Sequence, residues 1–301
     1  MHIAVIITCH NRKAKTLQCL SNLFAAGTAY NNNNRRDELH LAVFLTDDGC
    51  TDGTAEAVEK LADGNEIHII KGDGNLFWAG GMRAAWNEAL KERKKWDFYL
   101  LANDDTFAFD TLFDELFASH QYCLSHYGRA GLYSGVTCKP GHPDVTTYGG
   151  DKVDWLCRLH RVKPNGQPQP VDEANANLLL VPAEVVEQIG IFYEGYTHSS
   201  ADYDYTRQAV KHHIPVLITG NNCGECDYDH DSGKIEGEKV IQMNFRQRRA
   251  FLNHPLHSDK EYITFVRRNM PMRLPVTWVL RKLRLYFPKI YYGINRLRKI
   301  R

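Results

Sequence analysis

The stretch IAVIITCHNR, residues 3–12, decides the fold class of this 301-residue chain. Its first six residues carry no charge and polar residues follow, which is typical of a strand buried in a parallel sheet. Three similar runs come next: LAVFLTDD (41–48), IHIIKG (67–72) and DFYLLANDD (97–105). Between them the pattern predicts helices over 13–26, 54–62 and 80–94. This alternation predicts an α/β fold with a doubly wound, mostly parallel sheet.

Pairs of acids follow two of these predicted strands. Asp47 and Asp48 end the second, and Asp104 and Asp105 end the fourth. Parallel sheets of this kind bind ligands beyond the carboxyl ends of their strands. Adjacent carboxylates repel each other unless a cation binds, and their oxygens suit Mg²⁺ or Mn²⁺, which also bridge diphosphates. The alternatives are capping of the next helix by the second pair and turn chemistry or a nucleotide contact for the first.

The segment GDGNLFWAGG, residues 72–81, joins the third strand to its helix. Glycines allow close backbone approach, and a helix N-terminus favours phosphate. Trp78 is too apolar for a plain solvent loop, so it either lines a sugar pocket or packs on the sheet. The first strand is followed by TCHNRK without glycine. This argues against a nicotinamide oxidoreductase and against a sugar nucleotidyltransferase, which needs a glycine-rich phosphate loop there.

Two later segments carry further candidates. In SADYDYTR, residues 200–207, Asp202 stands where a helix is predicted to start, so it is either a helix cap or a general base for an acceptor hydroxyl. In CDYDHDSG, residues 226–233, His230 lies between two acids. A lone histidine is more often structural than a metal ligand.

The rest of the chain predicts short strands and hairpins over 130–180, a strand over 175–182, helices over 183–189 and 202–213, and helices after 240. Breaks are predicted at Pro271, Pro275 and Pro288. We therefore expect a catalytic domain over 1–238, with halves at 1–106 and 107–238, and a helical extension over 239–301.

Charge is unevenly distributed. Residues 267–301 hold eleven Lys or Arg and no acid, whereas the remaining residues hold 26 basic and 36 acidic side chains. An amphipathic basic helix on an anionic membrane would explain both the charge and the apolar residues. The alternative is a helix that packs on the catalytic domain or on the second subunit of a homodimer.

Targeting signals and cysteines indicate the compartment. No signal peptide precedes the first strand, and no apolar run is long enough to span a bilayer. The eight cysteines include a single CxxC, so a four-thiolate zinc site is not expected. These features predict a cytoplasmic protein, peripheral on the inner face of the plasma membrane if the tail binds lipid.

Taken in order, the quoted segments over residues 1–235 resemble the family 2 glycosyltransferases, which have a GT-A fold. GNLFWAGGM looks most like the bacterial rhamnosyl- and related transferases that build cell-surface polysaccharides. The resemblance implies a metal-dependent inverting hexosyltransferase. Its partners would be a nucleoside-diphosphate sugar donor and a saccharide or lipid-linked saccharide acceptor, with no nucleic acid.

The resemblance also implies roles for single residues. Its nucleotide-binding positions correspond to Thr8, Arg12, Asp47 and Asp104. Its metal ligands, for Mn²⁺ or Mg²⁺, correspond to Asp105 and His230. Its sugar and acceptor positions correspond to Trp78, Gly80, Gly81 and Arg83, the last of which replaces a frequent Asn.

The catalytic base of the resembled family corresponds to Asp202, but Ala201 replaces the glutamate that precedes it there. The replacement keeps one alternative open, a non-catalytic nucleotide-sugar binding protein.

Overall fold

The computed structural model describes residues 1–33, 38–61, 64–93, 95–155, 157–228 and 232–299. The chain divides into two units. The first comprises Met1–Glu194 and Ala201–Tyr228, and the second comprises Gly195–Ser200 and Asp229–Arg301. The division of the first unit near residue 106 stays a prediction.

A large mixed sheet forms the centre of the first unit. Its strands follow the order β10-β13-β6-β12-β4-β1-β2-β3, with β5 on β13 and β7 on β6. Their bounds are β1 His2–Cys9, β2 His40–Asp47, β3 Glu66–Lys71, β4 Phe98–Ala102, β5 Phe107–Ala108, β6 Leu132–Lys139, β7 His142–Tyr148, β10 Gln169–Pro170, β12 Leu178–Pro182 and β13 Val216–Glu225. A smaller sheet joins β8 Gly150–Val153, β9 Leu159–Val162 and β11 Glu173–Ala174.

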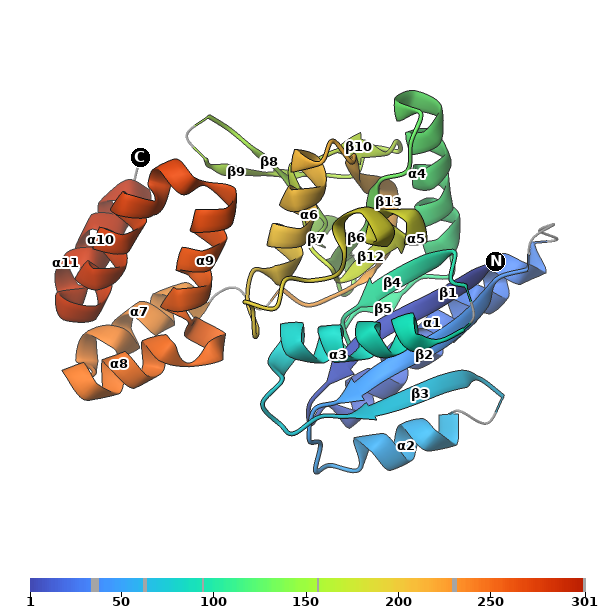
Figure 1. Ribbon diagram of the computed structural model, residues 1–301, viewed down its shortest axis with the longest axis horizontal. Helices are drawn as coiled ribbons and strands as arrows, with labels where there is room; N and C mark the ends of the chain where they lie inside the picture. The colour runs from blue at the N-terminus through green and yellow to red at the C-terminus, as the bar shows by residue number, and fades with distance from the viewer. Residues whose placement is uncertain (34–37, 62–63, 94, 156, 229–231, 300–301) are drawn as a thin grey trace. The chain divides into compact units, whose positions relative to one another are not determined.

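Helices cover both faces of the large sheet, as Figure 1 shows for α1 and α3 on either side of β1 and β2. Ile3, Val5 and Ile7 point to the face that packs against α1 and α4. The helices of this unit are α1 Lys13–Asn32, α2 Thr54–Leu61, α3 Phe77–Lys91, α4 Leu112–Tyr127, α5 Ala183–Ile189 and α6 Ala201–Lys211. Burial on both faces explains why the strands read as unbroken apolar runs.

The predicted doubly wound α/β fold with C-terminal helices is confirmed. Strands β1, β2, β3 and β4 run parallel to one another. β12 is antiparallel to β4, so its first residue, Leu178, lies beside Ala102 at the end of β4. After Asp105 the chain forms β5, and α4 begins only at Leu112. The second acid pair therefore does not cap a helix.

The second unit is helical. It contains α7 Ser232–Gln242, α8 Phe245–Asn253, α9 Asp259–Asn269, α10 Leu274–Tyr286 and α11 Pro288–Lys299, with short 3₁₀ turns at η1 Pro255–His257 and η2 Pro271–Arg273. Pro271 and Pro288 begin helices, where proline's missing N–H costs nothing. The basic tail thus comprises the end of α9, the η2 turn and the two helices α10 and α11. Among the described residues, no helix combines the length and apolar character needed to cross a bilayer.

Candidate active site

The sheet brings the carboxyl ends of β1, β2 and β4 to one edge. β1 and β2 pair in register up to Cys9 and Asp47, and β4 pairs with the other side of β1. Because the three strands are parallel neighbours, the residues that follow them lie close together. We call this edge, formed by residues 8–12, 47–50 and 103–105, the acid edge.

Arg12 connects the two acids that follow β4. Its Nη1 lies 3.1 Å from Asp104 Oδ1 and 2.7 Å from Asp105 Oδ2. The Asp104 side chain is 8% exposed and that of Asp105 23%, whereas Arg12 is 48% exposed. A single cationic nitrogen between two carboxylates shows that both oxygens converge on one point. A positive charge is therefore already accommodated where a metal was predicted.

Asp104 is held in a poorly solvated position. Burial, with the neighbouring Asp105 adding to it, raises the pKa of Asp104 from 3.8 to about 6 despite the opposing charge of Arg12. Thr16 Oγ1 donates to Asp104 Oδ2 at 3.3 Å. A buried acid beside a second carboxylate favours a divalent ion, because the ion offsets both the repulsion and the lost hydration. Asp104 and Asp105 thus fit the predicted Mg²⁺ or Mn²⁺.

The acids that follow β2 behave differently. Asp48, 3% exposed, accepts hydrogen bonds from three backbone N–H groups: Gly74 at 2.9 Å, Leu76 at 3.3 Å and Phe77 at 2.9 Å. It therefore organises the glycine-rich loop that leads into α3. Asp47 instead accepts a hydrogen bond from Cys50 N at 2.7 Å. The sequence did not distinguish these two roles.

Thr8 and the glycines of α3 bring the helix close to the sheet. A Cβ on Gly81 would collide with the Thr8 side chain, and Thr46 Oγ1 donates to Gly81 O at 2.8 Å. Gly80 is buried as well and lies against Leu76. Both glycines thus have a packing role. The predicted sugar contacts at Gly80 and Gly81, and the nucleotide contact at Thr8, stay predictions.

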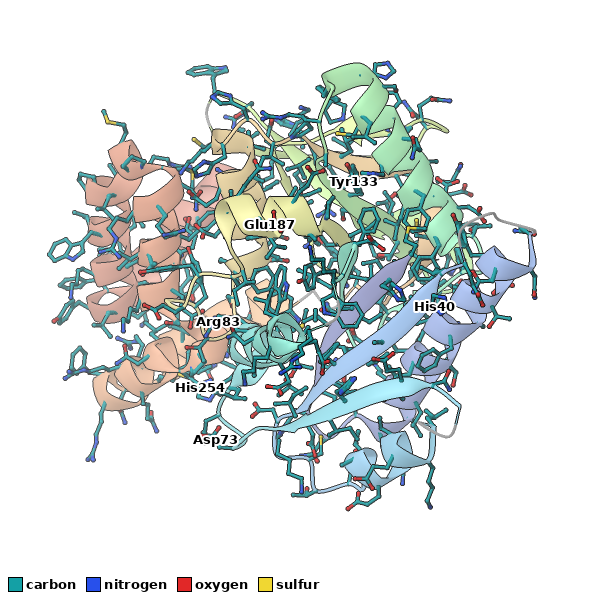
Figure 2. All side chains as sticks on the ribbon, turned by 45° about the vertical axis from the view of Figure 1, so that its right-hand side comes forward. His40, Asp73, Arg83, Tyr133, Glu187 and His254 are labelled. Atoms are coloured by element: carbon teal, nitrogen blue, oxygen red, sulfur yellow. The ribbon has the colours of Figure 1, made fainter. Side chains whose placement is uncertain are left out.

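Trp78 is tied to the acid edge. Its Nε1 donates to Asn103 Oδ1 at 2.8 Å, and its ring packs at 5.5 Å from Phe192. Asn103 immediately precedes the acid pair, so half-buried Trp78 lies beside the predicted metal position. Arg83 lies farther along α3, where its Nη1 donates to Tyr193 O at 3.3 Å (Figure 2).

Asp202 is positioned at the start of α6 by backbone donors. Tyr203 N donates to its Oδ1 at 2.9 Å and Ala176 N to its Oδ2 at 3.3 Å. Burial raises the pKa of Asp202 to about 6 even though these bonds oppose the shift. A carboxylate with a pKa near 6 is ionised at neutral pH and can accept a proton. Ala201, which replaces the resembled family's glutamate, is itself buried.

A short backbone connection joins Asp202 to the acid edge. Ala176, which donates to Asp202, is followed by Asn177, whose carbonyl accepts from Asn103 N at 3.1 Å. Asn177 Nδ2 also donates to Thr106 Oγ1 at 3.2 Å. The antiparallel entry of β12 beside the end of β4 produces this connection. The sequence alone gave no sign that residues 175–177 belong to the site.

The structure adds one residue and leaves another untested. Cys226, at 3% exposure, lies with its Sγ 4.0 Å from Asp105 Oδ1. This proximity depends on β13 and could not be anticipated from the CxxC spacing. His230, the predicted second metal ligand, lies outside the described residues.

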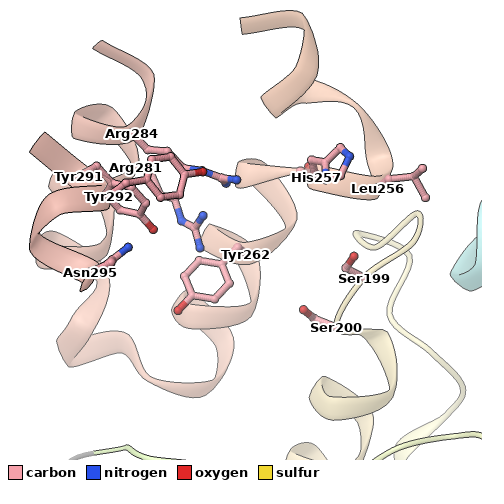
Figure 3. Close-up of a pocket in the computed structure, with 11 residues that line it drawn as sticks. Ser199, Ser200, Leu256, His257, Tyr262, Arg281, Arg284, Tyr291, Tyr292 and Asn295 are labelled. Atoms are coloured by element: carbon pink, nitrogen blue, oxygen red, sulfur yellow. The ribbon is translucent and has the colours of Figure 1, made fainter. Parts of the chain in front are cut away.

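A cavity of about 310 Å³ occupies the second unit (Figure 3). Two arginines of its wall, Arg281 and Arg284, each place Nη1 2.9 Å from the same oxygen of Asp259. Arg281 also lies 3.9 Å over the Tyr262 ring. Two of the eleven basic residues of the tail are thus paired inside this unit. None of the predicted site residues that the structure describes lines this cavity.

Comparison with known proteins gives one family match. Residues 4–120 match the family model described as glycosyl transferase family 2. These residues include the acid edge and α3, but not Asp202. A comparison with curated protein sequences finds no match.

Two solved structures share the fold. A crystal structure of GalNAc-T7 with UDP, GalNAc and Mn²⁺ has a TM-score of 0.53 at 10% identity, over 75% of this chain and 43% of that one. This chain therefore spans less than half of the GalNAc-T7 chain. A crystal structure of S. aureus TarS 1-349 has a TM-score of 0.50 at 16% identity, over 97% of this chain and 88% of that one. With these matches, residues 4–120 are identified as similar to glycosyl transferase family 2, and the chain has the GT-A fold that the sequence predicted.

Proposed function

We propose that this protein is an inverting glycosyltransferase that moves a sugar from a nucleoside-diphosphate sugar to an acceptor hydroxyl. The observation that carries the proposal is the connection of Asp202, through Ala176 and Asn177, to the Asp104–Asp105 pair. A single displacement requires a base for the acceptor and a centre that stabilises the leaving diphosphate. One short segment of chain joins the candidates for both. The similar GalNAc-T7 structure contains UDP, GalNAc and Mn²⁺.

The acid pair has the task of holding the donor's charged end. Asp104 and Asp105 would bind Mn²⁺ or Mg²⁺, and the bound ion would supply positive charge to the leaving diphosphate. Arg12, now paired with both acids, is a second cation at the same place and can turn to the phosphates. Asp47, at the end of the neighbouring strand, would contact the base or ribose, as the resemblance implies.

Asp202 has the task of accepting the acceptor's proton. The hydroxyl attacks the anomeric carbon from the face opposite the diphosphate, so one displacement inverts the configuration. Two backbone N–H groups fix the carboxylate. No second carboxylate nucleophile is required, in contrast to retaining glycosidases.

Substitution of Asp202 by Asn tests the base. We expect Asp202→Asn to retain donor binding and to lose transfer by roughly two to four orders of magnitude, the usual effect of removing a general base. Donor binding is measured by titration with nucleoside diphosphate and Mn²⁺. Transfer is measured by nucleoside diphosphate release with cell-envelope lipid or saccharide as acceptor.

Asp204→Asn is the matched control, because it changes an acid two residues away on the same helix α6. Near-normal transfer in Asp202→Asn would remove this residue from the mechanism. A product of retained anomeric configuration would contradict single displacement. Donor binding without any transfer in the unaltered protein would favour the non-catalytic alternative raised by Ala201.

We further propose that the acceptor is a lipid-linked saccharide of bacterial surface polysaccharide synthesis. The protein would meet this acceptor at an anionic membrane. On α10, Val276, Trp278 and Val279 are each more than half exposed, although Thr277 and Arg284 are buried. Exposed apolar side chains on a basic helix suit the headgroup region of a bilayer. Besides Arg281 and Arg284, which pair with Asp259, the tail holds nine further Lys or Arg residues.

Vesicle flotation tests this surface. We expect binding to anionic but not to neutral vesicles, weakened by salt, because Lys and Arg contribute about 1 kcal/mol each near an anionic surface. The double variant Trp278→Ser/Val279→Ser should bind less. Trp155→Ser is the control, since Trp155 is 88% exposed but belongs to the first unit. Salt-insensitive flotation, or equal loss in both variants, would contradict the proposal.

A further inference from the structure

Two thiols and a carboxylate meet within the acid edge. Cys9 ends β1, Asp47 ends β2 as its register partner, and Cys50 lies in the loop that follows. One ligand atom from each of the three lies within 4.8 Å of the other two. Cys9 is 3% and Asp47 9% exposed, while Cys50 is partly exposed. The proposed transfer reaction uses neither thiol.

The sulfur separation matches a tetrahedral metal site. Cys9 Sγ and Cys50 Sγ are 3.8 Å apart. Two thiolates bound to one tetrahedral Zn²⁺ at about 2.3 Å are themselves separated by about 3.8 Å. The carboxylate oxygen lies within 4.8 Å of both sulfurs, whereas a tetrahedral site needs about 3.5 Å, so a shift of roughly 1 to 1.5 Å brings it into position. The strand register holds Cys9 and Asp47, so the metal-free fold already sets most of this geometry.

The surrounding backbone is arranged for a sulfur that carries charge. Asn11, at φ 51°, donates its N–H to Cys50 Sγ at 3.2 Å, and its Oδ1 accepts from Thr51 N at 2.8 Å. A left-handed conformation is uncommon outside glycine, although Asn tolerates it. Here it turns the N–H toward the sulfur. Outer donors of this kind fix the orientation of metal ligands.

The local charge favours a cation over free thiolates. Burial, followed by the neighbouring Cys50, raises the pKa of Cys9 far above its usual range. Burial and the Asp47 carboxylate likewise raise the pKa of Cys50. Both thiols are therefore protonated in the metal-free protein. A soft divalent ion replaces the two protons and offsets the charge of Asp47, whereas Mg²⁺ and Mn²⁺ prefer oxygen ligands.

We propose that Cys9, Cys50 and Asp47 form a binding site for a thiophilic divalent cation, best fitted by Zn²⁺, separate from the oxygen-ligand site at Asp104 and Asp105. Three protein ligands leave one coordination position open to an external ligand. Binding converts two thiols to thiolates and releases two protons, with no change of oxidation state. A consequence that rests on the proposed function is that Zn²⁺ at this site withdraws Asp47 from the donor nucleotide.

Zinc titration of the reduced full-length protein against a chromophoric chelator tests the site. We expect one equivalent of Zn²⁺ to bind in the presence of excess Mg²⁺, with an affinity that rises with pH. Co²⁺ in its place should show thiolate-to-cobalt charge-transfer absorption. Cys50→Ser should weaken Zn²⁺ binding by roughly tenfold or more and reduce that absorption to about half, because Cys9 stays as the one thiolate ligand.

Cys157→Ser is the matched control, because Cys157 is also a partly exposed free thiol but lies elsewhere in the first unit. Undiminished Zn²⁺ binding in Cys50→Ser, or displacement of Zn²⁺ by Mg²⁺, would overturn the site. Asp47→Asn keeps both thiols and should show an intermediate loss. Zn²⁺ binding with unchanged nucleotide affinity would confirm the metal site and remove Asp47 from the proposed nucleotide pocket.

Discussion

Two pairs of adjacent aspartates follow two neighbouring strands of one sheet, yet the structure uses them in opposite ways. Asp48 accepts hydrogen bonds from three backbone N–H groups of the glycine-rich loop. Asp104 and Asp105 contact side chains instead, chiefly that of Arg12. Asp48 of the first pair thus organises the loop, whereas the oxygens of the second pair meet a half-exposed arginine.

The difference shows how a carboxylate becomes available for chemistry. Breaking a hydrogen bond between a carboxylate and a fixed backbone donor costs free energy, because it leaves a buried N–H unsatisfied. A carboxylate bonded to a half-exposed arginine can exchange that partner for a metal at small cost. The two pairs are therefore similar in sequence but differ in how firmly their hydrogen-bond partners are held.

The largest expected effect follows from the second pair. Asp105→Asn should lower transfer by roughly two to three orders of magnitude, because it removes one charge from the predicted metal position. Its free energy of unfolding should change by less than about 1 kcal/mol, since Asp105 is partly exposed and no longer repels Asp104. Activity and urea unfolding measure the two quantities. An Mn²⁺-dependent nucleotide affinity equal to that of the unaltered protein would contradict the assignment.

Substitution of Asp48, in the first pair, should instead lower the stability of the protein. Asp48→Ala should lower the free energy of unfolding by about 3 kcal/mol, because it leaves buried N–H groups of the loop without an acceptor. Urea unfolding and hydrogen exchange at Gly74 and Phe77 check this. Asp73→Ala on the same loop is the control, since Asp73 is exposed. A stable Asp48→Ala protein would end the distinction between the pairs.

The pH dependence sharpens the comparison further. The pKa of Asp104 is about 6 in the folded protein and 3.8 ordinarily, so the folded state holds the proton more tightly. Its contribution to stability is therefore greatest at low pH and declines as pH rises from 3.8 to about 6. Asp104→Asn should melt a few degrees above the unaltered protein at pH 7, without Mn²⁺, and lose this advantage near pH 4.

Metal-dependent binding should change with pH in the opposite direction. Protons compete with Mn²⁺ for Asp104, so metal-dependent nucleotide binding in the unaltered protein should weaken as pH falls through about 6. Titrations with Mn²⁺ between pH 5 and 8 measure this. An affinity that is flat across the range would show that Asp104 takes no part.

The smallest effect is expected at Arg12. Because Arg12 is half exposed, Arg12→Gln should cost at most about 1 kcal/mol of stability. Mn²⁺ alone should bind more tightly, since a competing cation is gone, while nucleoside diphosphate should bind less tightly. Calorimetric titration of each separates the two. Weaker binding of Mn²⁺ alone would mean that Arg12 supports the metal site instead of competing for it.

The sequence by itself determined the parallel half of the fold. Unbroken apolar runs such as IAVIIT, separated by helix-period segments, leave few arrangements other than a doubly wound sheet. That topology then places Asp47 and Asp105 at one edge, whatever the side chains do. The polar residues at the strand ends could also be predicted, because they follow directly after the apolar runs.

Only the tertiary structure decided which acid does what. The backbone donors to Asp48 lie 26 to 29 residues away in the chain. Of the two donors to Asp202, Ala176 N lies 26 residues away, just before β12, which runs antiparallel to β4. Likewise, the 3.8 Å approach of Cys9 to Cys50 depends on strand register and on the left-handed turn at Asn11. Local patterns report burial and periodicity, whereas these contacts are set by strand pairing between segments distant in the chain.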